Sequence, residues 1–348
     1  HDALPISQPA PAPGGNTLAA GLIPPGSTMD EFSLIDRFWK PLGDAVTHSE
    51  VIEGIGNDGA VVRCPPGQDQ VMTMDTLVEG VHFPRDMPPH ALGWRALAVN
   101  LSDLAAMGAQ PLCFTLSVTL PEASTSWLAA FADGMKALAV RENIQLVGGD
   151  TTRGPLSITV QAQGLLPAGS AVRRGNAQPG DRICVSGSLG EAGEALNWLD
   201  ESDTPDPAVD TALQRYRYPE PRLALGQWLR EAGSAAVDVS DGLLADLGHL
   251  LVDRGARLDW QALPVSDGLV SLRGLEGARR LAASAGDDYE LLFVWPGGGP
   301  APSGPKGSAL PLTVIGTVTE GAGVTLNGPE GSIQLEEQGY THFGGHHD

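Results

Sequence analysis

The amino-acid sequence predicts an α/β (α+β) protein of two domains, and three observations support this. The chain has 348 residues, which is enough for two domains of ordinary size. Segments with strand and helix patterns alternate along most of it. A turn-rich stretch at residues 167–181 separates two such series. We therefore expect a first domain at residues 29–166 and a second at residues 167–348.

In the first domain, strands and helices are expected to alternate. Strands are predicted at residues 70–75, 112–120, 144–147 and 156–166, and helices at residues 90–107 and 126–141. Residues 112–120 alternate strictly between apolar and polar side chains, which indicates a strand with one buried face. The helix at residues 90–107 ends where Gly108 and Pro111 follow. This β-α-β-β-like series is typical of one compact unit.

The second domain repeats the alternation with shorter elements. Strands are predicted at residues 182–186, 236–239, 289–295 and 312–318, and helices at residues 191–198, 219–231 and 242–252. Residues 201–209 and 297–307 are crowded with proline, glycine and acidic residues and are expected to be surface loops. Residues 1–28 are rich in proline, alanine and glycine without an apolar period, so we expect a disordered leader.

Composition excludes several classes of function. Lysine and arginine number 21 against 42 acidic residues, and a formal charge of −21 repels nucleic acid. No apolar run approaches the ~20 residues of a membrane span. The three cysteines lack CxxC spacing, so neither a disulfide framework nor a zinc site is indicated. We expect a soluble cytoplasmic protein that binds neither nucleic acid nor membrane, and any phosphate chemistry must proceed without a P-loop lysine.

Six aspartates stand in unusual surroundings, beside glycine or serine or at expected strand ends. They are Asp58, Asp75, Asp103, Asp150, Asp238 and Asp241. If these carboxylates converge, they repel one another unless divalent cations bridge them. Oxygen ligands without clustered cysteine or histidine favour Mg²⁺. Several Mg²⁺ ions are what the joining of two anionic phosphates needs, and the residues alone do not name the acceptor.

Structural roles are an alternative for each of these positions. The glycine-rich loop at residues 54–59 also suits a plain turn, and Asp75 a cap. Asp103 lies in an otherwise apolar helix on the same face as Asn100, or else on a narrow solvent side. Residues 148–154 combine glycines, hydroxyls, an acid and an arginine, as a phosphate and Mg²⁺ site or a tight hairpin would. Ser240 or Asp241 is also a suitable helix N-cap.

Eight segments taken together resemble the bacterial thiamine-monophosphate kinase family. They are EFSLIDRF (31–38), GIGNDGAVV (54–62), MDTLVEGVHF (74–83), ALAVNLSDLAAMGAQP (96–111), LVGGDTTRGPLSITV (146–160), AVDVSDGLLADLGHLL (236–251), GDDYELLF (286–293) and GYTHF (339–343). They recur in order over residues 29–343. The resemblance implies the two-domain fold of aminoimidazole ribonucleotide synthetase, in which N-terminal domains of two subunits pair into a β-barrel and ATP binds near that interface.

The activity implied is transfer of the γ-phosphoryl group of ATP to thiamine monophosphate, the last step of thiamine diphosphate biosynthesis. Transfer would be direct and in line, assisted by several Mg²⁺ ions, without a phosphoenzyme and without a catalytic acid or base. The implied Mg²⁺ ligands are Asp58, Thr73, Met74, Asp75, Asp103, Asp150, Asp238 and Asp241. The implied ATP contacts are Gly149, Asp150, Arg174 and Ser240. The implied contacts to thiamine monophosphate are His82, Asp287 and Phe343.

Three positions depart from the family pattern. Asn57 stands where the family usually has an aspartate, and Asp58 keeps the ligand position. Met74 replaces a frequent threonine, which is harmless if its backbone carbonyl makes the contact. Asp287 replaces a usual glutamate and is one methylene shorter, which affects the substrate contact most directly.

Two other functions remain as alternatives. One is another ATP-dependent synthetase of the same superfamily, such as selenophosphate synthetase, although the reactive cysteine and lysine of that enzyme are missing near residues 54–58. The other is a non-catalytic relative that binds cations or nucleotide. The presence of all six aspartates argues against a non-catalytic relative.

Overall fold

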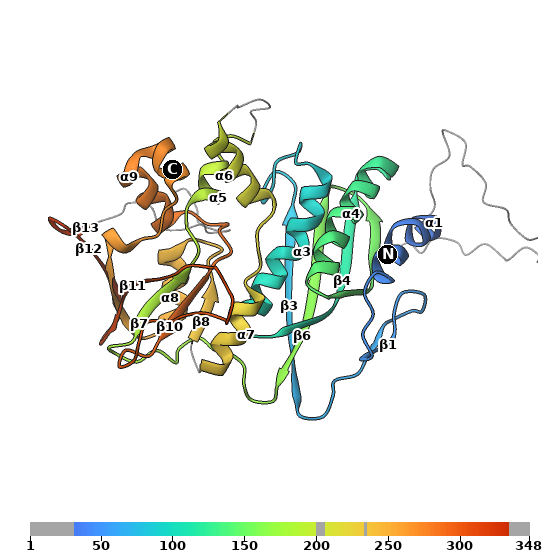
Figure 1. Ribbon diagram of the computed structural model, residues 1–348. Helices are drawn as coiled ribbons and strands as arrows, with labels where there is room; N and C mark the ends of the chain where they lie inside the picture. Colours follow the sequence, from blue (N-terminus) through green and yellow to red (C-terminus); the bar gives the residue numbers. More distant parts are fainter. Residues whose placement is uncertain (1–30, 200–205, 233–234, 334–348) are drawn as a thin grey trace, which may run out of the picture.

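The computed structural model describes residues 31–199, 206–232 and 235–333, and contains two sheets that lie side by side with helices packed on them (Figure 1). The predicted leader at residues 1–28 and Phe343 lie outside the described residues.

The first sheet has four strands in the order β3-β6-β4-β5. Their bounds are β3 Gln68–Val78, β4 Gln110–Leu120, β5 Gln145–Arg153 and β6 Ser157–Pro167. Helix α3 (Pro89–Ala106) joins β3 to β4, and α4 (Thr125–Arg141) joins the parallel strands β4 and β5. Both helices lie over the same face of the sheet (Figure 1). The predicted order of strands and helices in the first domain is confirmed.

The other face of this sheet carries no helix among the described residues. Thr115, Ser117 and Thr119 of β4 alternate with buried apolar residues, as predicted. Cys113, expected on the exposed side, is buried instead. Irregular register next to it and packing of β1 and β2 residues over it explain the difference.

The segment before the first sheet was not assigned elements from the sequence. It contains α1 (Glu31–Leu34), a π-helical turn (Ile35–Trp39), α2 (Lys40–Gly43), and the paired strands β1 (Val51–Glu53) and β2 (Val61–Val62). Phe38, Trp39 and Leu42 pack into the core, which anchors the segment. The glycine-rich segment at residues 54–59 lies in the loop that connects β1 to β2.

The second sheet has seven strands in the order β13-β12-β9-β11-β7-β10-β8. Their bounds are β7 Arg182–Ser186, β8 Ala235–Asp238, β9 Gly255–Asp259, β10 Leu291–Trp295, β11 Leu312–Thr319, β12 Gly323–Gly328 and β13 Gly331–Ile333. The helices are α5 Glu191–Ala195, α6 Pro207–Arg217, α7 Leu223–Ala232, α8 Leu243–Leu251 and α9 Asp267–Ser284, with a 3₁₀ turn at Trp260–Ala262.

Several elements of this half differ from the sequence prediction. Helices α6 and α9 and strands β9, β12 and β13 were not predicted. Residues 207–209 begin α6 rather than ending a loop, because Asp206 caps the helix by accepting a hydrogen bond from Ala208 N at 2.8 Å. Helix α7 starts at Leu223, four residues later than expected, since two prolines precede it. In α9, Gly274 has a non-helical φ of 68°, and this kink weakens the periodic pattern.

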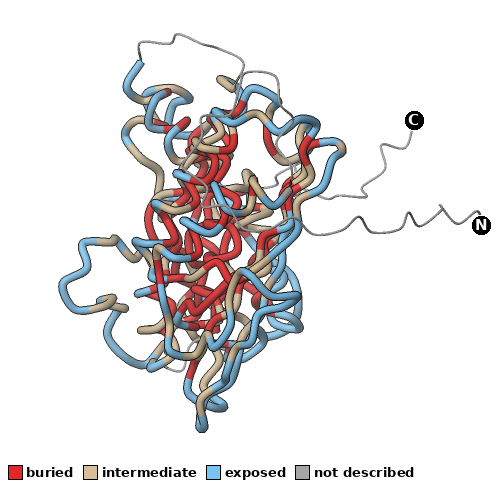
Figure 2. The backbone as a smooth tube through the Cα atoms, turned by 90° about the vertical axis from the view of Figure 1, so that its right-hand side faces the viewer, coloured by how far each residue is buried: buried red, intermediate tan, exposed pale blue. Residues whose placement is uncertain are grey.

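Helix α3 packs against both halves of the chain. Against α7 the approach is very close, because a Cβ on Gly226 would lie 1.9 Å from the carbonyl oxygen of Ala105. Arg230 Nη1 donates to Gly108 O at 2.6 Å, and Trp94 Nε1 to Pro219 O at 3.0 Å. Buried residues concentrate in the middle of the molecule (Figure 2). Within the described residues, no helix is both long and apolar enough to cross a membrane.

Candidate active site

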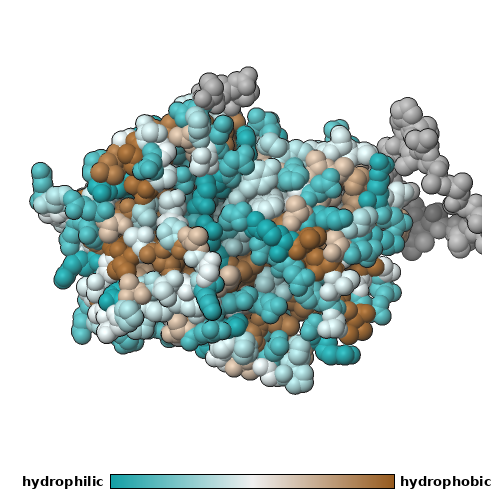
Figure 3. Space-filling view, viewed as in Figure 1, coloured by the Kyte–Doolittle hydropathy of each residue, from teal (hydrophilic) through white to brown (hydrophobic). Residues whose placement is uncertain are grey.

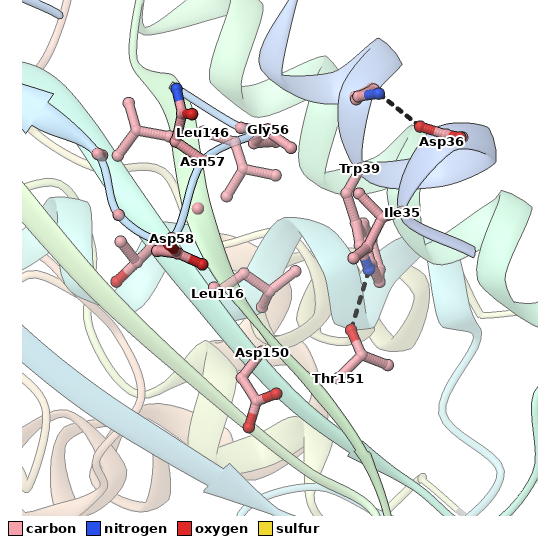
Figure 4. Close-up of a pocket in the computed structure, with 18 of the residues that line it drawn as sticks. Ile35, Asp36, Trp39, Gly56, Asn57, Asp58, Leu116, Leu146, Asp150 and Thr151 are labelled. Atoms are coloured by element: carbon pink, nitrogen blue, oxygen red, sulfur yellow. Dashed lines mark hydrogen bonds and ion pairs between the residues drawn. The ribbon is translucent and has the colours of Figure 1, made fainter. Parts of the chain in front are cut away.

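A cavity of about 640 Å³ lies at the β5 edge of the first sheet, and we call it the β5 cavity. It opens between the π-helical turn, the loop at residues 54–59 and strands β4 and β5 (Figure 4). Asp58 on the loop and Asp150 on β5 both face it (Figure 4). Its apolar lining includes Ile35, Trp39, Ile55, Leu116 and Leu146. The cavity therefore combines an apolar wall with two carboxylates.

The strand predicted to end at residue 147 continues through the sequence GGDTTR, because residues 148–153 belong to strand β5. Gly149 lies opposite Leu116 of β4, and a Cβ there would be 1.8 Å from the Leu116 carbonyl oxygen. This glycine is thus required by the packing of two strands. Trp39 Nε1 donates to Thr151 Oγ1 at 3.1 Å, which fixes the indole against the strand.

A second cavity, of about 560 Å³, lies between the two halves beside α3, and we call it the α3 cavity. Four of the predicted aspartates line it, namely Asp75, Asp103, Asp238 and Asp241. Thr73 Oγ1 donates to Asp103 Oδ2 at 2.5 Å, and Asn100 Oδ1 accepts from Asp75 N at 3.1 Å. Asp75 was expected at a strand end, but it lies inside the eleven-residue strand β3.

In the α3 cavity, each carboxylate makes the ionised form of its neighbours less favourable. Burial raises the pKa of Asp103 to about 7, and repulsion from Asp238 adds to the rise. The Arg174 guanidinium acts in the opposite direction on the same pKa, which places Arg174 near this cavity. Burial likewise raises the pKa of Asp238 to about 6. A bound cation would relieve this repulsion.

The turn that carries Ser240 and Asp241 is held by a residue that the sequence analysis missed. Asp246 Oδ2 accepts hydrogen bonds from Ser240 N and Asp241 N, both at 3.0 Å, and from Gly242 N at 3.2 Å. Burial raises the pKa of Asp246 to about 6. The sequence did contain a signal for this role, because Asp246 is an acidic residue in the first turn of the helix predicted at residues 242–252.

The predicted substrate contacts His82 and Asp287 also line the α3 cavity. His82 Nδ1 accepts from Val78 N at 3.0 Å, so a neutral ring carries its proton on Nε2. Arg95, Tyr216 and Tyr289 line the cavity as well and were not predicted. Arg95 could have been noticed as a lone charge within the apolar sequence GWRALAV.

The structure thus divides the six aspartates between two cavities. Asp58 and Asp150 lie at the β5 cavity, while the other four lie at the α3 cavity. Among the described residues, no three histidine, cysteine, aspartate or glutamate side chains converge closely enough to hold an ion alone. Met74 follows Thr73 in β3, so the two side chains lie on opposite faces of the sheet, and Met74 is 63% exposed. Arg173 and Arg174 are exposed on the connection between the sheets.

Comparisons with known proteins agree on one family. The model for the N-terminal domain of AIR synthase related proteins matches residues 56–166. The thiamine-monophosphate kinase of Salmonella typhimurium is 43% identical over 328 residues, covering 90% of this chain and 98% of the relative. That of Bacillus subtilis is 33% identical over 329 residues, covering 90% of this chain and 100% of the relative.

Solved structures give the same result. The crystal structure of thiamine-monophosphate kinase from Stenotrophomonas maltophilia matches with a TM-score of 0.77 at 43% identity, covering 86% of this chain and 96% of that one. AaThiL complexed with AMPPCP and TMP matches with a TM-score of 0.72 at 33% identity, covering 90% and 97%. The hydrogenase maturation protein HypE of Escherichia coli, at 21% identity and a TM-score of 0.63, shares the fold.

Proposed function

Because the chain belongs to the thiamine-monophosphate kinase family and phosphorylates thiamine monophosphate with ATP, we propose that the nucleotide binds at the β5 cavity and the acceptor in the α3 cavity. The main support is that the six aspartates are divided between these two cavities. The β5 cavity offers an apolar wall for a base beside Gly149 and Asp150. The α3 cavity offers clustered carboxylates beside His82 and Asp287.

The donor atoms present suit Mg²⁺. They are carboxylate, hydroxyl and backbone oxygens, and the pKa values of Asp103 and Asp238 are raised as expected for acids placed to share a cation. Mg²⁺ bridging protein to phosphate needs only one or two carboxylates per ion. We propose Asp58, Thr73, Met74 through its carbonyl, Asp75, Asp103, Asp150, Asp238 and Asp241 as the ligands.

The protein's part in the reaction is positioning. When bound, Mg²⁺ neutralises phosphate charge and aligns donor and acceptor. Gly149 would hold the phosphates of ATP at the β5 cavity, and Ser240 and Arg174, which lie at or near the α3 cavity, would hold the γ end of the triphosphate beside the acceptor. A phosphate monoester is already largely ionised near neutral pH, so no general base is required. The acceptor phosphate can therefore attack in line without help from His82, whose role is binding.

We infer that two chains pair through the first sheet. Its open face carries Met72 and Met74 on the edge strand β3, with exposed fractions of 62% and 63%. Exposed apolar residues on a free edge strand are usually covered. Elsewhere, on the face that carries α3 and α4, hydrophilic and hydrophobic residues are interspersed (Figure 3). Sedimentation velocity should give a dimer for the wild type and a shift toward monomer for Met74→Asp.

We also infer a cytoplasmic location. The three cysteines are all free thiols, and Cys64 is exposed. A reducing compartment would keep an exposed thiol in this state.

The decisive experiment incubates the purified protein with ATP, Mg²⁺ and thiamine monophosphate and detects thiamine diphosphate by mass-resolved chromatography. Free thiamine serves as the parallel acceptor and should give no diphosphate. Asp103→Asn should require more Mg²⁺ for half-maximal rate, whereas Asp210→Asn, on the exposed side of α6, should not. An unchanged Mg²⁺ requirement in Asp103→Asn would remove that residue from the ligand set.

A further inference from the structure

Arg95 is an arginine buried in a helix of apolar neighbours. It lies in the middle of α3, and its side chain is 1% exposed. Burying a guanidinium is costly unless its donors are paired. Within the described residues its Nε has no hydrogen-bond partner, although both terminal nitrogens donate. A charge kept at this cost calls for a functional explanation.

The contacts of Arg95 cross from the first half of the chain to the second. Nη2 donates to Asp287 Oδ1, and Nη1 donates to Tyr216 O at 2.7 Å. The guanidinium carbon lies 4.2 Å from the centroid of the Tyr216 ring and 5.6 Å from that of Tyr289. Both contacts are in the range of cation–π attraction. Arg95 thus fixes two tyrosines and one carboxylate that line the α3 cavity.

The segment that carries Asp287 and Tyr289 is strained. Their φ angles are 67° and 50°, a left-handed conformation that costs free energy for residues other than glycine. The backbone is held by hydrogen bonds from Asp287 N to Ser240 O and from Tyr289 N to Val239 O, both 2.9 Å. Strain of this kind persists where the surroundings enforce it, and it concentrates at functional sites.

The carboxylate of Asp287 has a defined orientation. Oδ1 accepts from Arg95 and also from Tyr289 Oη at 3.3 Å. Among the described residues, Oδ2 is left as the oxygen that a ligand in the α3 cavity can use. Tyr216, which also lines this cavity, donates from Oη to His82 O at 2.9 Å. Arg95 therefore connects, directly or through Tyr216, to both proposed contacts of the acceptor.

We propose that Arg95 is a positioning residue that sets the orientation of Asp287, and through Tyr216 the His82 segment, for the ring system of thiamine monophosphate. This rests on the proposed function, because it names the residue that organises the acceptor side of the same site. Arg95 acts on affinity for the acceptor and leaves the nucleotide at the β5 cavity unaffected.

The test separates this role from a merely structural one. Arg95→Lys keeps the charge but has a single donor nitrogen, and it loses the planar fork that pairs with Asp287 and Tyr216 together. We expect the KM for thiamine monophosphate to rise roughly tenfold and the KM for ATP to stay within about twofold, since a less stable enzyme lowers kcat without changing KM selectively. In an Asp287→Asn background, Arg95→Lys should raise the KM for thiamine monophosphate little further, because the carboxylate through which Arg95 acts is already lost.

The matched control is Arg141→Lys. Arg141 also joins the two halves, donating to Glu220 at 2.9 Å, and also lies over an aromatic ring, 4.5 Å from Trp94. It does not line the α3 cavity. Its replacement should leave both KM values unchanged. Equal KM values for thiamine monophosphate in wild type and Arg95→Lys would overturn the proposal, whereas a wild type that makes no thiamine diphosphate would overturn the proposed function itself.

Discussion

Glu290→Gln tests the ion-pair network beneath the acceptor site. The Glu290 side chain is fully buried, and its Oε1 accepts from Arg215 Nη2 at 2.6 Å and from Arg222 Nη2. Its Oε2 accepts from Arg222 Nε at 2.7 Å and from Ser186 Oγ at 2.5 Å. A Cβ on Gly187 would lie 2.2 Å from Oε1, so a glycine makes room for the carboxylate.

The substitution keeps the shape of the side chain and removes its charge. Arg215 and Arg222, only 21% and 18% exposed, then lose their shared counter-ion. One oxygen acceptor also becomes an amide donor that faces their N–H groups. Breaking a buried pair from one side costs about 3–5 kcal/mol. The backbone bond from Val239 N to Glu290 O, 2.8 Å, ties this network to the strained segment above it.

Urea unfolding followed by circular dichroism measures the effect as a change in free energy of unfolding. Glu220→Gln is the matched control, because Glu220 pairs with Arg141 at 2.9 Å but is 42% exposed, and an exposed pair contributes about 0–1 kcal/mol. We expect the two variants to differ by at least about 2 kcal/mol. Equal unfolding free energies would refute the assignment of Glu290 as a structural anchor.

Two further predictions concern β5 and the α3 cavity. Gly149→Ala forces β4 and β5 apart, and it should destabilise the fold by about 1–3 kcal/mol in thermal unfolding and weaken ATP binding in a nucleotide titration. Gly148→Ala, whose Cβ would meet no described atom within 4 Å, is the control for stability and should leave the free energy of unfolding unchanged. Asp103 and Asp238 have folded pKa values of about 7 and about 6, above the ordinary 3.8, so their stabilising contribution is complete below pH 3.8 and is lost as pH rises through 6–7. In EDTA, the wild type should therefore lose stability relative to Asp103→Asn between about pH 4 and pH 7. Unfolding midpoints that change with pH in the same way in the two proteins would contradict this.

The sequence was most informative where the apolar period was long. Helix α3 is Pro89–Ala106 against a prediction of residues 90–107, and β6 is Ser157–Pro167 against residues 156–166. Periodicity failed in α9, where half-exposed positions and the kink at Gly274 hide the helical pattern. It also ended β5 too early, since Gly148 and Gly149 resemble a turn although β4 requires them within a strand.

The arrangement of the site depends on strand register and on contacts between the halves, and neither is encoded in a local pattern. The prediction that Asp103 and Asn100 lie on one face of α3 is confirmed, because both side chains form hydrogen bonds with β3. The sequence could not show that Asp150 belongs to a cavity at the far edge of the same sheet. The role of Arg95 depends on Asp287, 192 residues later, which only the folded chain brings into contact.

Sheet geometry limits how the aspartates can share metal ions. Asp75, Val160, Leu116 and Gly149 are successive partners across β3, β6, β4 and β5, and Asp150 follows Gly149. Three strand spacings separate Asp75 from Asp150 by about 14 Å. Mg²⁺ binds oxygen at about 2.1 Å, so one ion cannot reach both carboxylates within a chain.

We therefore expect at least two metal positions per chain, one near each cavity. Titration with Mn²⁺ in the presence of AMPPCP, followed by electron paramagnetic resonance, should show about two or more ions bound per chain. Asp150→Asn should weaken one class of site and leave the other, because its carboxylate lies about three strands away from Asp75. A single bound ion per chain, lost equally in Asp150→Asn and Asp75→Asn, would mean that the two cavities do not act as separate metal positions.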